Sequence, residues 1–104
     1  MNLISRDELR AKLERGETFK LVMTLPAHSH IVKRIPTSLH FETVDEALAA
    51  LDPDEEIVVY CAGDPCAASI RAYHLLERAG YTHVLRYPGG IADWENAGYP
   101  LKLS

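Results

Sequence analysis

The sequence has few of the features that would place it in a specialised class of proteins. Its 104 residues include two cysteines, one tryptophan and no apolar run near the length of a membrane span. The two cysteines, Cys61 and Cys66, lie in one short segment and do not resemble the disulfide framework of a small secreted protein. Nothing near Met1 resembles a signal peptide, so we expect a cytoplasmic protein.

Clustered positive charge is also missing. Lys and Arg number 11 against 15 Asp and Glu, which gives a net charge of −4. Nucleic acids and anionic membranes are bound through clusters of Lys and Arg, so neither is expected as a partner.

What remains is the composition of an ordinary globular protein, with 47% hydrophobic and 25% charged residues. A chain of this length can bury roughly two thirds of its unfolded surface. We therefore expect a single domain over residues 1–104 that needs no disulfide, metal or cofactor to fold. No internal repeat or linker divides it.

The most informative stretch begins with four apolar or aromatic residues, residues 57–60, that lead directly into Cys61. A Gly-Asp-Pro turn follows, and good helix formers begin at Ala67. This pattern predicts a buried strand that delivers a thiol to a loop opening a helix. Because the first turn of a helix has unpaired N–H groups and about half a positive charge, a sulfur held there is stabilised as a thiolate. Cys61 is therefore a candidate nucleophile rather than an inert buried thiol.

The rest of the chain predicts alternating helices and strands. Capping boxes at Ser5 to Glu8 and Thr43 to Glu46 begin two helices. The second has an apolar stripe of Val44, Leu48 and Leu51. Strands are expected at residues 19–25, 57–60 and 83–87, with a short, partly exposed strand within 35–41 after an irregular segment 27–34.

The longest helix is expected at residues 67–79, with Ile70, Tyr73, Leu75 and Leu76 on its buried side, and a last helix at 91–97. This alternation indicates an α/β fold with a mainly parallel central sheet flanked by helices on both faces. Ligands of such sheets bind beyond the carboxyl ends of the strands, which is where Cys61 lies.

These residues resemble the rhodanese-like sulfurtransferase domains. The resemblance is carried by the Val-Val-Tyr-Cys strand end at Cys61 and a helix that ends in Leu-Leu-Glu-Arg-Ala-Gly-Tyr at Tyr81. It continues through Gly89-Gly90, Trp94 and the Ala-Gly-Tyr-Pro that ends at Pro100. The ordered combination covers the second half of the chain, whereas the first half is similar mainly in layout. Ile35-Pro36 followed by Leu39 resembles the family's His-Ile-Pro-Gly-Ala segment.

The sequence departs from the family pattern in three places. Met23-Thr24-Leu25 replaces the usual Asp-Val-Arg, and Arg34 replaces the histidine before Ile-Pro. Both are mainly structural positions. In the active loop, seven residues separate Cys61 from Ser69, two more than the commonest spacing, and the arginine usually found there is missing.

The resemblance implies a sulfurtransferase in which the Cys61 thiolate takes sulfur from a donor and carries it as a persulfide to a thiol or cyanide acceptor. Its partners would be a small sulfur donor and acceptor or a sulfur-relay protein. The loop would cradle the anionic sulfur through its backbone N–H groups. That loop consists of Ala62, Gly63, Asp64, Pro65, Cys66 and Ala67.

The charge of this loop bears on the donor. It offers one carboxylate and no cationic side chain to thiosulfate, a dianion, so we expect a persulfide to be the better donor. Arg71, one turn into the following helix, is the only nearby cation in this reading.

Several residues have alternative interpretations. Cys66 is either a resolving thiol that closes a disulfide with Cys61 or a compact residue at the helix start. Ser69 either hydrogen-bonds the loop or packs in the first turn. Trp94 and Tyr73 are interpreted as core. The histidines have no zinc-type spacing, so no metal site is expected; they are His28, His30, His40, His74 and His83.

Two other functions compete with sulfur transfer. The first is a noncatalytic or regulatory module that binds a partner or senses reactive sulfur or oxidants, and a sensor would need the same reactive Cys61. Phosphatases and arsenate reductases of this fold also have longer loops, but they use an arginine after the cysteine to bind the oxyanion, and this sequence lacks it.

Overall fold

The computed structural model describes residues 1–24, 33–62 and 67–103. Its centre is a parallel sheet in the order β1 (Lys20–Met23), β3 (Ile57–Tyr60) and β4 (Val84–Tyr87). Single bridges extend the sheet at both edges, where Leu3 pairs with Arg86 and Val22 with Leu39. β3 is therefore the middle strand, as its uninterrupted apolar sequence predicts.

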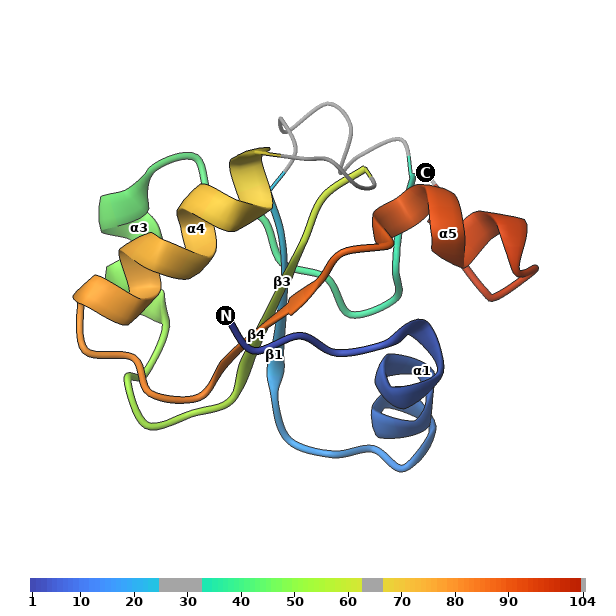
Figure 1. The fold of residues 1–104 in the computed structure, drawn as a ribbon, viewed down its shortest axis with the longest axis horizontal. Helices are drawn as coiled ribbons and strands as arrows, with labels where there is room; N and C mark the ends of the chain where they lie inside the picture. The colour runs from blue at the N-terminus through green and yellow to red at the C-terminus, as the bar shows by residue number, and fades with distance from the viewer. Residues whose placement is uncertain (25–32, 63–66, 104) are drawn as a thin grey trace.

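Helices cover both faces of the sheet, as Figure 1 shows. α1 (Arg6–Glu14) and α5 (Gly90–Asn96) lie on one side, and α3 (Val44–Ala50) and α4 (Ala67–Arg78) on the other. The expected α/β fold with a parallel sheet flanked on both faces is thus confirmed. The expected strands at 57–60 and 83–87 and helices at 67–79 and 91–97 are found within one residue of their predicted ends.

β3 separates two hydrophobic cores. All four of its residues are 0% exposed, and they alternate between the two faces. Ile57 and Val59 pack in the core under α4, with Tyr73 and Leu76 of that helix. The other two, Val58 and Tyr60, pack in the core under α1 and α5, which contains Leu9, Ile91 and Trp94. A strand buried on both sides cannot move without disturbing both cores, so its end is a rigid support.

The two predicted capping boxes differ in the structure. At α1, Ser5 Oγ accepts from Glu8 N at 3.2 Å and the Glu8 carboxylate accepts from Ser5 N at 3.1 Å, so that box is complete. At α3, Thr43 Oγ1 accepts from Glu46 N, but the Glu46 carboxylate accepts from Glu42 N instead. The second capping box is therefore only half formed.

The prediction of a strand within residues 35–41 is wrong, because the pairing there is limited to one isolated bridge at Leu39. Ile35 O accepts from Ser38 N at 3.1 Å, and Thr37 has φ 74°, so residues 35–38 form a tight turn around Pro36. The strand lies just before, in the segment expected to be irregular. There β2 (Lys33–Arg34) pairs antiparallel with β5 (Lys102–Leu103), which the sequence did not predict.

Two side chains expected on buried helix faces are exposed. Leu75 of α4 is 41% exposed and Val44 of α3 is 46% exposed. The buried side of α4 consists instead of Ser69, Tyr73 and Leu76. Within the described part of the chain, no helix is long and apolar enough to cross a membrane.

Candidate active site at Cys61

Cys61 directly follows β3 and is 2% exposed. Its backbone is held from the α5 side, because Ile91 N donates to Cys61 O at 3.0 Å and Ala92 N donates to Ala62 O at 2.8 Å. The first turn of α5 thus uses two of its N–H groups to fix the start of the loop. The predicted nucleophile is placed at the carboxyl end of the central strand, as expected.

The peptide before Cys61 is held from the opposite edge. Thr24, at the end of β1, donates to Tyr60 O from both its backbone N at 2.9 Å and its Oγ1 at 3.0 Å. Thr24 belongs to the Met-Thr-Leu segment that departs from the family pattern, so one residue of this departure supports the peptide before Cys61. Its contribution was missed because β1 and β3 lie far apart in the sequence.

Tyr60 adds a third attachment through its side chain. Its hydroxyl lies 2.5 Å from Ser38 Oγ and accepts from Ile35 N at 3.2 Å. Ser38 Oγ donates to Ile35 O, so Tyr60 is the donor to Ser38. Burial raises the pKa of this phenol and keeps it neutral. The strand that carries Cys61 is therefore tied to the turn at residues 35–38.

The structure adds a second cation at the first turn of α4 to the predicted Arg71. Arg71 is exposed, whereas Arg86 of β4 is 5% exposed and its Nε donates to Ser69 Oγ at 2.9 Å. Ser69, 1% exposed, therefore has a specific partner in the sheet. The signal that could have identified Arg86 is a charged residue inside an otherwise apolar strand.

The remaining loop predictions fall mostly outside the described residues; these are Gly63, Asp64, Pro65 and Cys66. Ala62 and Ala67, which border that segment, are exposed. Cys61 is disulfide-bonded in this structure. Any chemistry that uses its thiolate therefore begins from the reduced protein.

The turn before α5 depends on two glycines. Gly90 has φ 64°, and a Cβ on Gly89 would lie 2.6 Å from a carboxylate oxygen of Asp93. Asp93 accepts from Tyr87 Oη at 2.7 Å and from Arg6 at 3.1 Å. Burial, with the adjacent Asp93, raises the pKa of Tyr87. These contacts position the helix end that holds Cys61.

The aromatic residues interpreted as core are confirmed as core. Trp94 is 1% exposed and its Nε1 donates to Pro100 O at 2.7 Å. Tyr73 is 3% exposed and its hydroxyl accepts from Asn2 N at 2.9 Å. Among the described residues, no group of three His, Cys, Asp or Glu side chains could hold a metal ion; His28 and His30 lie outside them.

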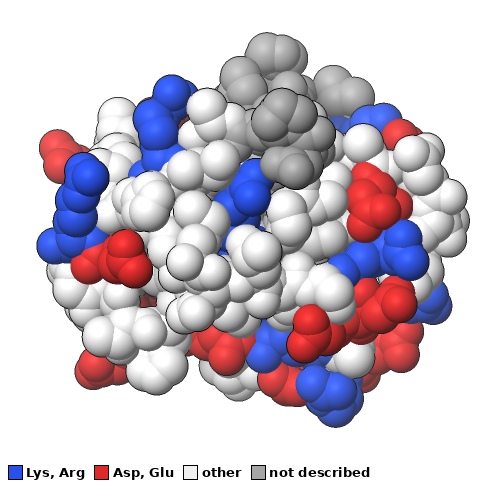
Figure 2. All heavy atoms as spheres, in the orientation of Figure 1, with Lys and Arg blue, Asp and Glu red and all other residues white. Residues whose placement is uncertain are grey.

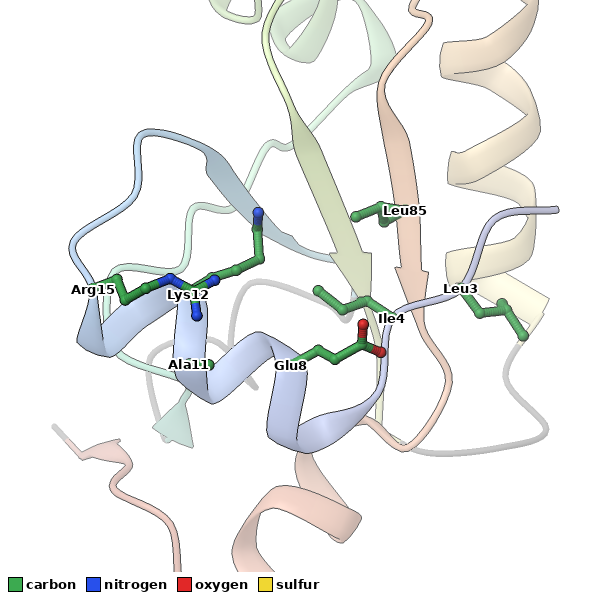
Figure 3. Close-up of a pocket in the computed structure, with 7 residues that line it drawn as sticks. All are labelled: Leu3, Ile4, Glu8, Ala11, Lys12, Arg15 and Leu85. Atoms are coloured by element: carbon green, nitrogen blue, oxygen red, sulfur yellow. The ribbon is translucent and has the colours of Figure 1, made fainter.

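A cavity of about 420 Å³ lies beside α1, and Cys61 is not one of the residues that line it (Figure 3). Lys12 and Arg15 border it, but Lys12 is paired with Glu17 and Glu56, and Arg15 with Glu17. Acidic and basic atoms are interspersed over this part of the surface in Figure 2. The two cations that border the cavity are therefore already paired with carboxylates, and we assign the cavity no role.

Comparison with known proteins agrees with the observed fold. The family model of the rhodanese-like domain matches residues 5–97. The rhodanese-like domain of an Anabaena protein superimposes with a TM-score of 0.88 at 28% identity, over 100% of this chain and 80% of that one. A rhodanese-like domain protein of Staphylococcus aureus has a TM-score of 0.83 at 24% identity, over 100% and 99%, and supports the fold.

A further relative is a transcriptional regulator. An HTH-type transcriptional regulator of Mycobacterium tuberculosis is 33% identical over 100 residues. The match covers 94% of this chain but 43% of the regulator, so the chain spans less than half the length of that relative.

Proposed function

Because the chain belongs to the rhodanese-like domain family, we propose that it is a sulfurtransferase that carries sulfane sulfur as a persulfide on Cys61. The donor is thiosulfate or, preferentially, a persulfide, and the acceptor is a thiol, cyanide or a sulfur-relay protein. The observation that carries the proposal is the position of Cys61, at the end of a strand buried on both faces. Its backbone is fixed by donors from α5.

The proposed reaction has two steps. The Cys61 thiolate attacks the outer sulfur of the donor, a new S–S bond forms, and the donor's own S–S bond breaks. Sulfite, or the thiolate of a persulfide donor, leaves with the electron pair. An acceptor thiolate or cyanide then attacks the terminal sulfur of the Cys61 persulfide and restores the thiolate. Such double displacement gives ping-pong kinetics.

Mass spectrometry of the intact protein tests this proposal. Reduced wild type, Cys61→Ser and Cys66→Ser are incubated with thiosulfate or with a glutathione persulfide. We expect wild type and Cys66→Ser to gain the mass of one sulfur atom and to lose it to cyanide, while Cys61→Ser gains nothing. No adduct on wild type from either donor would refute sulfur transfer.

The preference among donors is a separate proposal. Residues 62–68 include one carboxylate and no Lys or Arg, which disfavours a dianion at that loop. We expect kcat/KM to be higher with a persulfide donor than with thiosulfate. Equal values for the two donors would contradict this preference without affecting the role of Cys61.

A regulatory role is the second candidate, and the resemblance to a transcriptional regulator favours it. In that role the module senses reactive sulfur or oxidants at Cys61, and Cys66 is the resolving thiol that closes a disulfide. Mild peroxide treatment of the reduced protein, followed by peptide mapping, tests this role. A Cys61–Cys66 link that forms faster than sulfur transfer supports sensing, and its absence removes Cys66 from the mechanism.

The phosphatase or arsenate reductase alternative retains only the longer loop in its favour. An aryl phosphate offered to the reduced protein tests it. Hydrolysis that is lost in Cys61→Ser would replace sulfur transfer with phosphoryl chemistry.

A further inference from the structure

Arg86 is a charged residue inside a buried strand. The other three residues of β4 are Val, Leu and Tyr, and Arg86 itself is only 5% exposed. An arginine stays charged at any ordinary pH. Burial of that charge is costly unless the guanidinium donates hydrogen bonds or lies beside an opposite charge. Its Nε donates to Ser69 Oγ at 2.9 Å, which brings the guanidinium to the first turn of α4.

The same side chain lies on the Cys61 face of the sheet. In the parallel register Arg86 is the partner of Val59, and Val59 packs under α4. Cys61 is two residues beyond Val59 and directly follows the end of β3, so the alternation of the strand, continued by one residue, would direct its side chain to the same face. A strand spacing of about 4.8 Å and two rises of about 3.3 Å place the two Cα atoms about 8 Å apart. An extended arginine spans most of that separation.

The other charged groups discussed for this site are less suited than Arg86 to stabilise a negative charge on Cys61. Arg71 is on α4 but exposed, and residues 62–68 contain no Lys or Arg. Asp93 of α5 is bound by Tyr87 and Arg6 on the opposite face.

We propose that Arg86 is a positioning residue that stabilises anionic sulfur on Cys61, both directly through its charge and through its hold on Ser69. The inference rests on the proposed function only in taking Cys61 as the nucleophile. It assigns to the sheet the positive charge that the loop sequence lacks. It also replaces Arg71 as the cation expected at the site.

The test measures the Cys61 thiolate without any sulfur donor. In reduced Cys66→Ser protein, Cys61 is the single thiol, and its ultraviolet thiolate absorbance is followed as the pH rises, with the Cys61→Ser, Cys66→Ser double variant as blank. We expect a midpoint at least about one unit below the ordinary thiol value of about 8.5. Arg86→Met should raise the midpoint by about one unit, and Arg86→Lys by clearly less.

Arg71→Met is the matched control, because it removes an exposed arginine of α4 that lies two residues after Ser69. It should leave the midpoint of the Cys61 titration unchanged. Arg86→Gln keeps a donor for Ser69 and replaces Arg86→Met if that variant is unfolded by circular dichroism. A loss of stability alone would not move the midpoint of a folded variant. A parent midpoint at or above about 8.5, or an unchanged midpoint in a folded neutral variant, overturns the inference.

The outcomes also separate this inference from the proposed function. If the midpoint moves with Arg86 but no persulfide forms on wild type, the role of Arg86 stands and sulfur transfer fails. If persulfide forms equally fast in Arg86→Met, Arg86→Lys and the parent, sulfur transfer stands and the role of Arg86 fails.

Discussion

The hydroxyl of Tyr60 provides a quantitative test of how the end of β3 is held. Tyr60→Phe removes one oxygen, and with it the contacts at 2.5 Å to Ser38 Oγ and at 3.2 Å from Ile35 N. Ile35 is 0% exposed and Ser38 is 7% exposed, so water cannot easily replace the lost partner. An unsatisfied buried polar group costs about 1–3 kcal/mol, and we expect a loss of about 2 kcal/mol in the free energy of unfolding.

Urea and thermal unfolding followed by circular dichroism measure this loss. For a domain of this size 1 kcal/mol corresponds to roughly 4–8 °C in Tm, so Tyr60→Phe should lower Tm by roughly 8–16 °C. Tyr99→Phe is the matched control, because its hydroxyl donates to exposed Asp7, and it should cost less than about 0.5 kcal/mol.

A double-mutant cycle isolates the contact itself. Tyr60→Phe combined with Ser38→Ala should cost less than the sum of the two single changes, because both remove the same hydrogen bond. Equal losses for Tyr60→Phe and Tyr99→Phe, or strict additivity with Ser38→Ala, would refute the reasoning that the buried hydroxyl supports the strand end.

Three further predictions concern the scaffold. Thr37→Gly should raise the free energy of unfolding by about 0.5–1 kcal/mol in a urea titration, because a β-branched residue at φ 74° is strained and glycine is not; a decrease would contradict this. Ser5→Ala should lower Tm through a loss of about 1 kcal/mol at the α1 N-cap, and an unchanged Tm would show that the cap is dispensable. The part of the stability that Tyr60 and Tyr87 contribute should be fully present below about pH 10 and be lost above it, because their pKa values are raised in the fold and the unfolded chain releases those protons first. Urea titrations across this pH range check the sign, and a fall that is just as steep in the Tyr60→Phe, Tyr87→Phe double variant would contradict the assignment.

The parts of the fold that could be predicted are those encoded locally. The uninterrupted apolar run of β3 and the helix formers after Ala67 place Cys61 between a strand and a helix without knowledge of any distant contact. Ser5 begins a helix because its cap uses only the next turn. Local chemistry was sufficient for these elements, whereas it did not identify the turn at residues 35–38 and predicted a capping box at Thr43 that is only half formed.

The parts that could not be predicted depend on partners far along the chain. Leu75 fits the apolar period of α4, yet the sheet below meets that helix along Tyr73 and Leu76, so Leu75 is exposed. β2 forms because residues 33–34 meet residues 102–103. Arg86 was not predicted as a site residue because its partner, Ser69, belongs to another element.

The carbonyls of Tyr60, Cys61 and Ala62 all accept hydrogen bonds, the first from Thr24 just after β1 and the next two from α5. In a trans peptide the C=O and the following N–H point in opposite directions. A carbonyl that is turned toward α5 therefore turns the next amide away from it. The N–H of Ala62 is thus directed toward the side of the sheet that α4 covers. Helix α5 sets the orientation of an amide that it does not itself contact.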